Sequence, residues 1–196
     1  HIQRIVSDAN LGELKLQTLR ALPIPKENGK YRVICIPTVR DRLVQRTILH
    51  NLTAKKDLLN VRHNNTFGAA KGKEQGTHAA IDEAVRRRQV KQFVLKTDIS
   101  KFFDNIPRDY LIQQIKVCLR KRAVVPILEQ VVRCEINVGN DKHRELIELS
   151  GIARGKGLRQ GMPLSPLLSN LVLNKFDKML VKQGKSFLRY VDDLIV

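Results

Sequence analysis

Three aspartates occupy positions from which an acidic centre could form on a sheet. Asp192 and Asp193 are adjacent and lie between short apolar segments, which predicts a hairpin with carboxylates at its turn. Asp98 falls near the end of a short apolar, β-prone segment, residues 92–99, which we expect to be a buried strand. If this strand lies beside the hairpin, three carboxylates share one rim of a sheet, where two Mg²⁺ ions could drive nucleotidyl transfer.

Each aspartate also has a simpler interpretation. An adjacent pair is common in exposed hairpin turns, and a single aspartate is usually a helix cap or an ion-pair partner. The composition favours the combined interpretation. The chain has 196 residues with 36 Lys and Arg against 19 Asp and Glu, a net charge of +17 that predicts a polyanionic partner such as nucleic acid. An acidic cluster in such a protein is anomalous unless metal ions neutralise it.

Composition excludes several other classes of protein. Hydrophobic residues make up 42% of the chain, which is too many for a disordered basic tail. The three cysteines have no CxxC spacing, which argues against a disulfide framework or a structural zinc site and favours a reducing, cytoplasmic location, with an organelle as the alternative. No apolar run is long enough to span a membrane, so we expect no membrane partner.

Periodicity and turn signals predict the elements that must position these residues. Asn28-Gly29 predicts the reversal of a basic hairpin whose second strand is Tyr31 to Ile36. A second pair of strands is expected over 138–147. Ser165 is expected to cap the long helix that Gly184 ends. Further helices are expected over 11–22, 39–52, 77–88 with Thr77 as its cap, 107–122 with Pro107 in its first turn, and 125–132.

Five segments resemble, in order, the reverse transcriptases of the bacterial group II intron-encoded type. They are 31–45 (YRVICIPTVRDRLVQ), Phe67-Gly68 and Gly72 with 77–81 (THAAI), 98–106 (DISKFFDNI), 157–170 (GLRQGMPLSPLLSN) and 190–193 (YVDD). The resemblance implies an α/β (α+β) right-hand polymerase, with an antiparallel palm sheet packed on helices and a basic fingers hairpin. It assigns residues 1–91 to the fingers, 92–109 to the palm, 110–158 to a fingers return segment and 159–196 to the palm. The thumb is then expected after residue 196.

The resemblance also assigns the metal ligands. Asp98 and Asp192 are the expected direct ligands of two Mg²⁺ ions, for which Mn²⁺ could substitute. Asp193 is expected to be more peripheral, and the backbone carbonyl of Ile99 to contribute a further oxygen.

Other matched residues are expected to bind the incoming nucleotide. Phe103 matches the aromatic gate that excludes a ribose 2′-hydroxyl, although core packing is the simpler alternative. Lys26 and Arg32 match positions that bind the triphosphate, where a solvated surface is the alternative, and Gln160 matches a contact near the sugar. The remaining motif residues, with structural roles, are Tyr190, Gly161, Pro163 and Ser165.

Several residues depart from the family pattern, and two of them lie in the segment 157–170. Arg159 stands where the family commonly has proline, and Met162 where it has a small residue. Either change could alter contacts with nucleotide or template.

The implied function is RNA-directed DNA polymerisation, in which dNMP is added to the 3′-hydroxyl of a DNA primer on an RNA template. One alternative is a module that binds structured intron RNA and assists splicing. The other is an RNA-dependent RNA polymerase, against which Phe103 argues. The motifs do not distinguish mobile-intron, retron-like, CRISPR-associated and defence-associated branches, and they leave the oligomeric state open.

Overall fold

The computed structural model describes residues 2–27, 31–54, 58–59, 61, 63–68, 76–120, 122–139 and 141–196. The helices are α1 (Ile2–Asn10), α2 (Val39–Ala54), α3 (Thr77–Arg88), α4 (Phe102–Asn105), α5 (Arg108–Leu119), α6 (Val125–Arg133), α7 (Asp141–Ser150) and α8 (Ser165–Lys182). The strands are β1 (Leu19–Pro25), β2 (Tyr31–Ile36), β3 (Thr66–Phe67), β4 (Lys96–Asp98), β5 (Ile136–Asn137), β6 (Leu188–Tyr190) and β7 (Asp193–Ile195).

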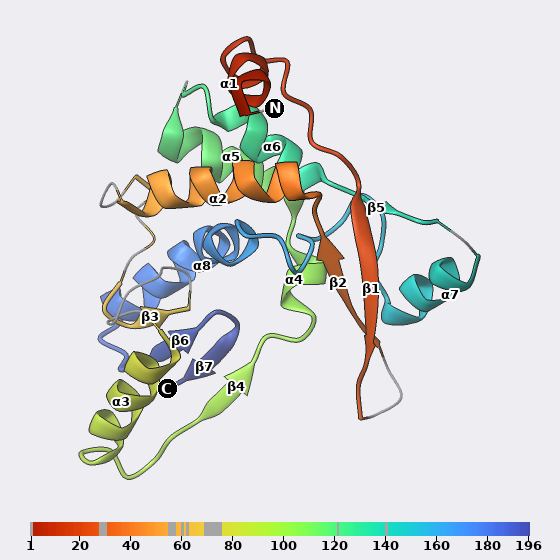
Figure 1. The fold of residues 1–196 in the computed structure, drawn as a ribbon. Helices are drawn as coiled ribbons and strands as arrows, with labels where there is room; N and C mark the ends of the chain where they lie inside the picture. Colours follow the sequence, from red (N-terminus) through yellow and green to blue (C-terminus); the bar gives the residue numbers. More distant parts are fainter. Residues whose placement is uncertain are drawn as a thin grey trace.

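Helices form most of the main core, and two small sheets lie beside them: β1 and β2 on the right of Figure 1, and β6 and β7 at its lower left. Helix α5 packs against α6 and α8, because apolar residues recur on one face of each helix. Fully buried side chains in this core include Leu111, Ile115, Leu128, Val131 and Leu168. The position of α8 matters for function, because its other buried side chains reach the sheet that carries the paired aspartates.

The first sheet contains the basic hairpin, with strand order β2-β1-β5. Strands β1 and β2 are antiparallel, from Arg20 opposite Ile36 to Pro25 opposite Tyr31, and the expected Asn28-Gly29 reversal lies outside the described residues. Strand β5 pairs in parallel with Leu19 and Arg20 only. Among the described strands, the second half of β1 pairs with β2 alone, an edge position at which prolines are tolerated. Helix α7 packs against this hairpin (Figure 1).

The second sheet carries the paired aspartates and has strand order β3-β6-β7-β4. It is antiparallel from β6 through β7 to β4, as expected for the palm, with β3 added in parallel to β6. Phe67, Ala80 and Leu188 form a second, smaller core beneath it, where α3 packs on β6.

Three predicted elements are wrong. The helix expected over 11–22 is absent: α1 ends earlier, Gly12 adopts a φ of +75°, and residues 19–25 form β1. The strand pair expected over 138–147 is wrong because α7 covers most of it, in a run of good helix formers. The strand expected over 92–99 is shortened to β4 and is exposed rather than buried, because β4 lies at the edge of the sheet that the described strands form.

The helices over 39–52, 77–88, 125–132 and 165–182 are confirmed, with small differences at their starts. Gly76 rather than Thr77 is the cap of α3, Pro107 is the cap of α5, and Ser165 is already helical in α8. Among the described residues, no helix is long and apolar enough to cross a membrane.

Candidate active site

The paired aspartates lie at a tight and strained hairpin. Tyr190 in β6 pairs with Asp193 in β7, so Val191 and Asp192 form a two-residue turn. Val191 has a φ of +57°, a left-handed conformation that is costly for a β-branched residue. Gly68 lies against this turn with a φ of +90°, and a Cβ there would come within 2.8 Å of Val191 Cγ2. The Phe67-Gly68 motif therefore packs against the hairpin because a side chain would not fit.

A fully buried arginine supports the hairpin from below. The Arg189 guanidinium donates to both carboxylate oxygens of Asp177 in α8, with Nε 2.9 Å from Oδ1. Its Nη1 donates to Asn170 Oδ1 at 2.8 Å and to the carbonyl of Val191. Helix α8 thus holds the strained residue directly before Asp192.

Strand β4 brings Asp98 to the same hairpin, as the sequence predicted. Asp98 lies opposite Asp193 in the β4–β7 register. Asp98 and Asp192 both line a cleft of about 240 Å³, whereas Asp193 is exposed and does not line it. Burial raises the pKa of Asp192, and the nearby charges of Asp98 and Asp193 add to this effect. The site thus concentrates negative charge that a cation would neutralise.

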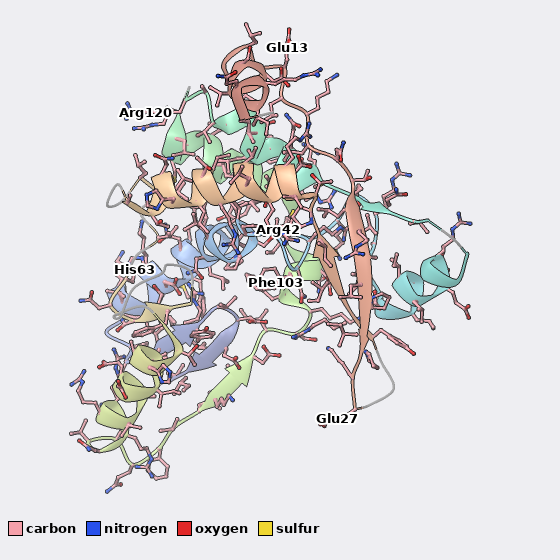
Figure 2. The ribbon with its side chains drawn as sticks, in the orientation of Figure 1. Glu13, Glu27, Arg42, His63, Phe103 and Arg120 are labelled. Atoms are coloured by element: carbon pink, nitrogen blue, oxygen red, sulfur yellow. The ribbon has the colours of Figure 1, made fainter. Side chains whose placement is uncertain are left out.

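The opposite wall of the cleft is basic and comes from the first sheet. Lys26 follows β1, Arg32 lies in β2, and both line the cleft beside Tyr31 and Val33. In Figure 2, Glu27 lies just beyond the end of β1, and Phe103, which belongs to α4, lies between the two sheets. The structure therefore places both predicted triphosphate-binding residues across the cleft from the two aspartates.

The short helix α4 forms the floor of the cleft and carries two adjacent phenylalanines that differ in burial. Phe102 is 7% exposed and belongs to the main core, whereas Phe103 is half-buried. Their rings meet edge to face with centroids 5.5 Å apart. Both rings line the cleft, so Phe103 rests on a partner that the core holds in place.

Gln160 completes the set of predicted nucleotide contacts that line the cleft. Its carbonyl accepts a 2.7 Å hydrogen bond from the backbone N–H of Cys35 in β2. Gly161 follows with a φ of +103°, and a Cβ there would lie 2.7 Å from the Cys35 carbonyl oxygen. Pro163 continues the turn, and Ser165 donates its hydroxyl to the Arg159 carbonyl rather than capping α8. Tyr190 contributes structurally, since its hydroxyl lies 3.0 Å from Thr77 Oγ1.

Sequence reasoning missed several residues of the cleft. Asp104 directly follows Phe103, lines the cleft and is half-buried; burial raises the pKa of its carboxyl, while Arg159 and Lys101 oppose the shift. Its place in the matched motif 98–106 was the available signal. Ser150 at the end of α7 also lines the cleft, and no motif indicated it because α7 itself was not predicted.

The donor atoms of the cleft fit magnesium. Within the described part of the chain, no group of three or more His, Cys, Asp or Glu side chains could hold a metal unaided. The expected third carboxylate, Asp193, therefore does not complete a protein-only site. Mg²⁺ usually binds one or two carboxylates and takes its other ligands from water and substrate phosphates. Asp98 and Asp192, with Ile99 beside them in the cleft, match this pattern.

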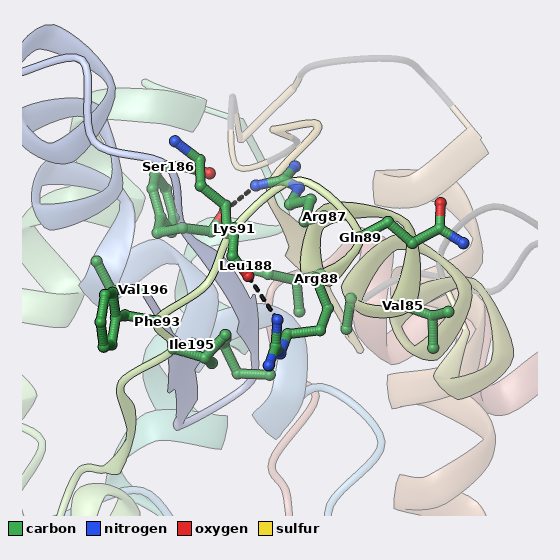
Figure 3. A pocket seen from close by; sticks show the side chains of 13 residues that line it. Val85, Arg87, Arg88, Gln89, Lys91, Phe93, Ser186, Leu188, Ile195 and Val196 are labelled. Carbon is green, nitrogen blue, oxygen red and sulfur yellow. Dashed lines mark hydrogen bonds between the residues drawn. The ribbon is translucent and has the colours of Figure 1, made fainter.

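A second cavity lies apart from these carboxylates. It measures about 700 Å³ and lies between the end of α3, residues 93–94 and strands β6 and β7 (Figure 3). Arg87 crosses to the carbonyl of Phe187 at 2.6 Å, and Arg88 donates to the carbonyl of Lys91 at 2.7 Å. Arg87 therefore ties α3 to Phe187, the residue directly before β6.

An acidic hairpin on one sheet that shares a cleft with a basic hairpin on another is the arrangement of a right-hand polymerase. The chain belongs to the reverse transcriptase (RNA-dependent DNA polymerase) family, whose model matches residues 24–196. It is 30% identical over 175 residues to protein YkfC of Escherichia coli, covering 82% of this chain and 40% of YkfC. It is 24% identical over 187 residues to the group II intron-encoded protein LtrA of Lactococcus lactis subsp. cremoris, covering 95% of this chain and 29% of LtrA.

The fold of this chain is similar to that of solved structures. A chain of a partial Cas6-RT-Cas1–Cas2 complex superposes with a TM-score of 0.56 at 24% identity, covering 99% of this chain and 31% of that one. The curated relatives are longer proteins: this chain spans 20% of a yeast intron protein, 40% of YkfC and half of a retron reverse transcriptase.

Proposed function

We propose that the protein containing this chain is an RNA-directed DNA polymerase, which adds dNMP to a primer 3′-hydroxyl on an RNA template. One observation carries the proposal: Asp98 and Asp192 share a single cleft with Lys26 and Arg32. Nucleotidyl transfer needs acidic metal ligands beside the reacting phosphate and cationic side chains that bind the rest of the triphosphate, all within one site. We take the β2-β1-β5 sheet to belong to the fingers and the sheet with the acidic hairpin to the palm.

The acidic end of the cleft has the metal-binding role. Asp98, Asp192 and the carbonyl of Ile99 hold divalent cations, and Asp193 adds negative charge from outside the cleft. Two Mg²⁺ ions, or Mn²⁺ in their place, would supply activation of the 3′-hydroxyl and stabilisation of the leaving pyrophosphate.

The other cleft residues bind and select the nucleotide. Lys26 and Arg32 bind its phosphates and offset their repulsion from the carboxylates. Phe103 lies under the sugar, where its ring leaves no room for a 2′-hydroxyl. Gln160 contacts the nucleotide near the sugar from the loop fixed to β2.

The test uses a single isosteric change in the full-length protein. Asp192→Asn keeps the size of the side chain but removes a charge that binds metal. We expect incorporation of dNMP on an RNA template to fall by at least about 100-fold, the scale of losing one key electrostatic contact. Asp109→Asn, which changes an exposed carboxylate in α5, is the matched control and retains activity. Synthesis at the wild-type rate by the Asp192 variant would refute the catalytic assignment.

Binding of structured RNA is a second candidate function. The net charge of +17 and the similarity to a group II intron-encoded protein favour it. The same Asp192→Asn variant separates the two functions, because RNA binding by basic surfaces should survive the loss of synthesis. If RNA binding falls together with synthesis, the two activities depend on one site.

A further inference from the structure

The loop that carries Gln160 is held by an ion-pair cluster that no motif indicated. Glu135, between α6 and β5, accepts from Arg108 Nη1 and from Arg159 Nη2, each at 2.6 Å. It also accepts from the backbone N–H of Gly155 at 2.9 Å. One carboxylate therefore joins two guanidinium groups and the loop backbone.

Both guanidinium groups reach further into the same loop. Arg159 donates to the Ala153 carbonyl at 2.8 Å, and Arg108 donates through Nε to the Gly157 carbonyl at 2.8 Å. Together with Glu135, these contacts fix the loop backbone at residues 153, 155 and 157. The loop then leads directly to Arg159 and Gln160.

The two arginines of the cluster are buried, which costs desolvation free energy, whereas Glu135 is 25% exposed. The Arg159 side chain is 2% exposed and the Arg108 side chain 6%, with one atom of each guanidinium lacking a protein partner. Burial alone would raise the pKa of Glu135, but hydrogen bonds from Arg159, Arg108 and the Gly155 N–H outweigh it and lower that pKa. Apolar replacements of buried ion pairs are often as stable as the originals, so stability alone does not account for this cluster.

The position of the cluster indicates what it does. The backbone carbonyl of Gln160 accepts a hydrogen bond from the Cys35 N–H in β2, and the carbonyl of Arg159 accepts one from the Ser165 hydroxyl at 2.7 Å. The side chain of Arg159 fixes the backbone directly before Gln160 through its ion pair with Glu135. Gln160 thus enters the cleft from a backbone anchored on both sides, within reach of the floor that Phe103 and Asp104 form.

We infer that Arg159, through its ion pair with Glu135, is a positioning residue that sets the affinity of the enzyme for the incoming nucleotide by orienting Gln160. The inference rests on the proposed polymerase function. It gives a role to Arg159, which departs from the family pattern: its buried side chain fixes the backbone of the nucleotide-binding loop.

The experiment measures nucleotide binding without chemistry. The full-length protein is bound to an RNA template and a dideoxy-terminated DNA primer with Mg²⁺, and the Kd of the next correct dNTP is measured. Arg159→Met should raise this Kd about tenfold while the Kd for primer–template stays within about twofold. Glu135→Gln, which keeps the shape of the carboxylate, should act in the same direction. Arg154→Met is the matched control, because Arg154 lies exposed in the same loop.

A double-variant cycle separates positioning from a merely structural role. Gln160→Ala should also raise the dNTP Kd, and Arg159→Met should add no more than about twofold in the Gln160→Ala background, because it acts through the missing side chain. Additive effects, or an unchanged Kd in Arg159→Met and Glu135→Gln, would overturn the inference. A wild-type protein that binds primer–template but neither binds nor incorporates dNTP would instead refute the proposed function.

Discussion

The buried pair between Arg189 and Asp177 permits a quantitative prediction about the acidic hairpin. The two side chains are 0% and 1% exposed. Asp177→Leu leaves a buried guanidinium without its counter-ion, and breaking a buried pair in this way costs about 3–5 kcal/mol of unfolding free energy. At about 2–4 °C per kcal/mol for a domain of this size, Tm should fall by roughly 6–20 °C.

The assay is urea denaturation followed by circular dichroism, with an exposed pair as the control. Arg133 and Asp109 also form an ion pair at 2.7 Å, but their side chains are 57% and 88% exposed. Asp109→Leu should therefore cost no more than about 1 kcal/mol. If Asp177→Leu costs as little as Asp109→Leu, burial does not govern the strength of the Arg189–Asp177 pair and the reasoning is refuted.

A double variant then separates stability from positioning. Asp177→Leu with Arg189→Met removes both charges, so most of the lost unfolding free energy should return. The Val191 carbonyl nevertheless loses its Arg189 donor, and the strained turn before Asp192 loses its attachment to α8. We expect the double variant to fold but to incorporate dNMP slowly. Wild-type incorporation by this variant would show that the turn needs no such support.

Three further predictions concern the floor of the cleft. Phe103→Ala should increase rNTP incorporation relative to dNTP incorporation at least about tenfold, and an unchanged nucleotide preference would contradict the proposed gate. Phe102→Ala should mainly lower the unfolding free energy, by about 3–5 kcal/mol. Burial raises the pKa of Asp104, so the wild-type protein should lose unfolding free energy relative to Asp104→Asn as pH rises above 3.8 and through the raised pKa. Urea denaturation at several pH values measures this difference, and a difference that does not change with pH would contradict the prediction. Gly157→Ala should cost more unfolding free energy than Gly155→Ala. Both glycines have a φ of +76°, but a Cβ at Gly157 would lie 2.6 Å from the Asp104 carbonyl oxygen, whereas a Cβ at Gly155 would meet no atom within 4 Å. Equal costs would contradict the close contact at Gly157.

The sequence predicted the contents of the cleft better than the elements around it. Asp98, Phe103, Gln160 and Asp192 each lie in a short motif that resembles the reverse transcriptase family, and the resemblance implied the role of each. The hairpin at Asp192 needs only two short apolar segments and a turn, so it could be read from neighbouring residues. Its partner strand followed because Asp98 ends a β-prone segment.

Long-range contacts could not be predicted in the same way. Glu135 pairs with Arg108 and Arg159, which lie 27 and 24 positions away, and nothing near any of the three signals the others. Leu14 and Leu19 belong to the apolar pattern that predicts a helix over 11–22, yet Leu14 is buried from an irregular segment and Leu19 from β1, because the core accepts apolar side chains from either conformation. Adjacency to Asp192 and the YVDD motif both place Asp193 in the predicted acidic centre, in a more peripheral role, and successive residues at a turn need not face the same cavity.

The charge of the cleft differs from that of the whole chain. Three cationic side chains, Lys26, Arg32 and Lys101, and three carboxylates, Asp98, Asp104 and Asp192, line it, so these charges balance. The excess of +17 must therefore lie elsewhere on the protein. Nucleic-acid binding through many phosphate contacts weakens steeply with salt, whereas a balanced cleft that binds one nucleotide is less sensitive. Raising salt should consequently weaken primer–template binding far more than dNTP binding, so the basic surface and the cleft act as separable parts of the proposed polymerase.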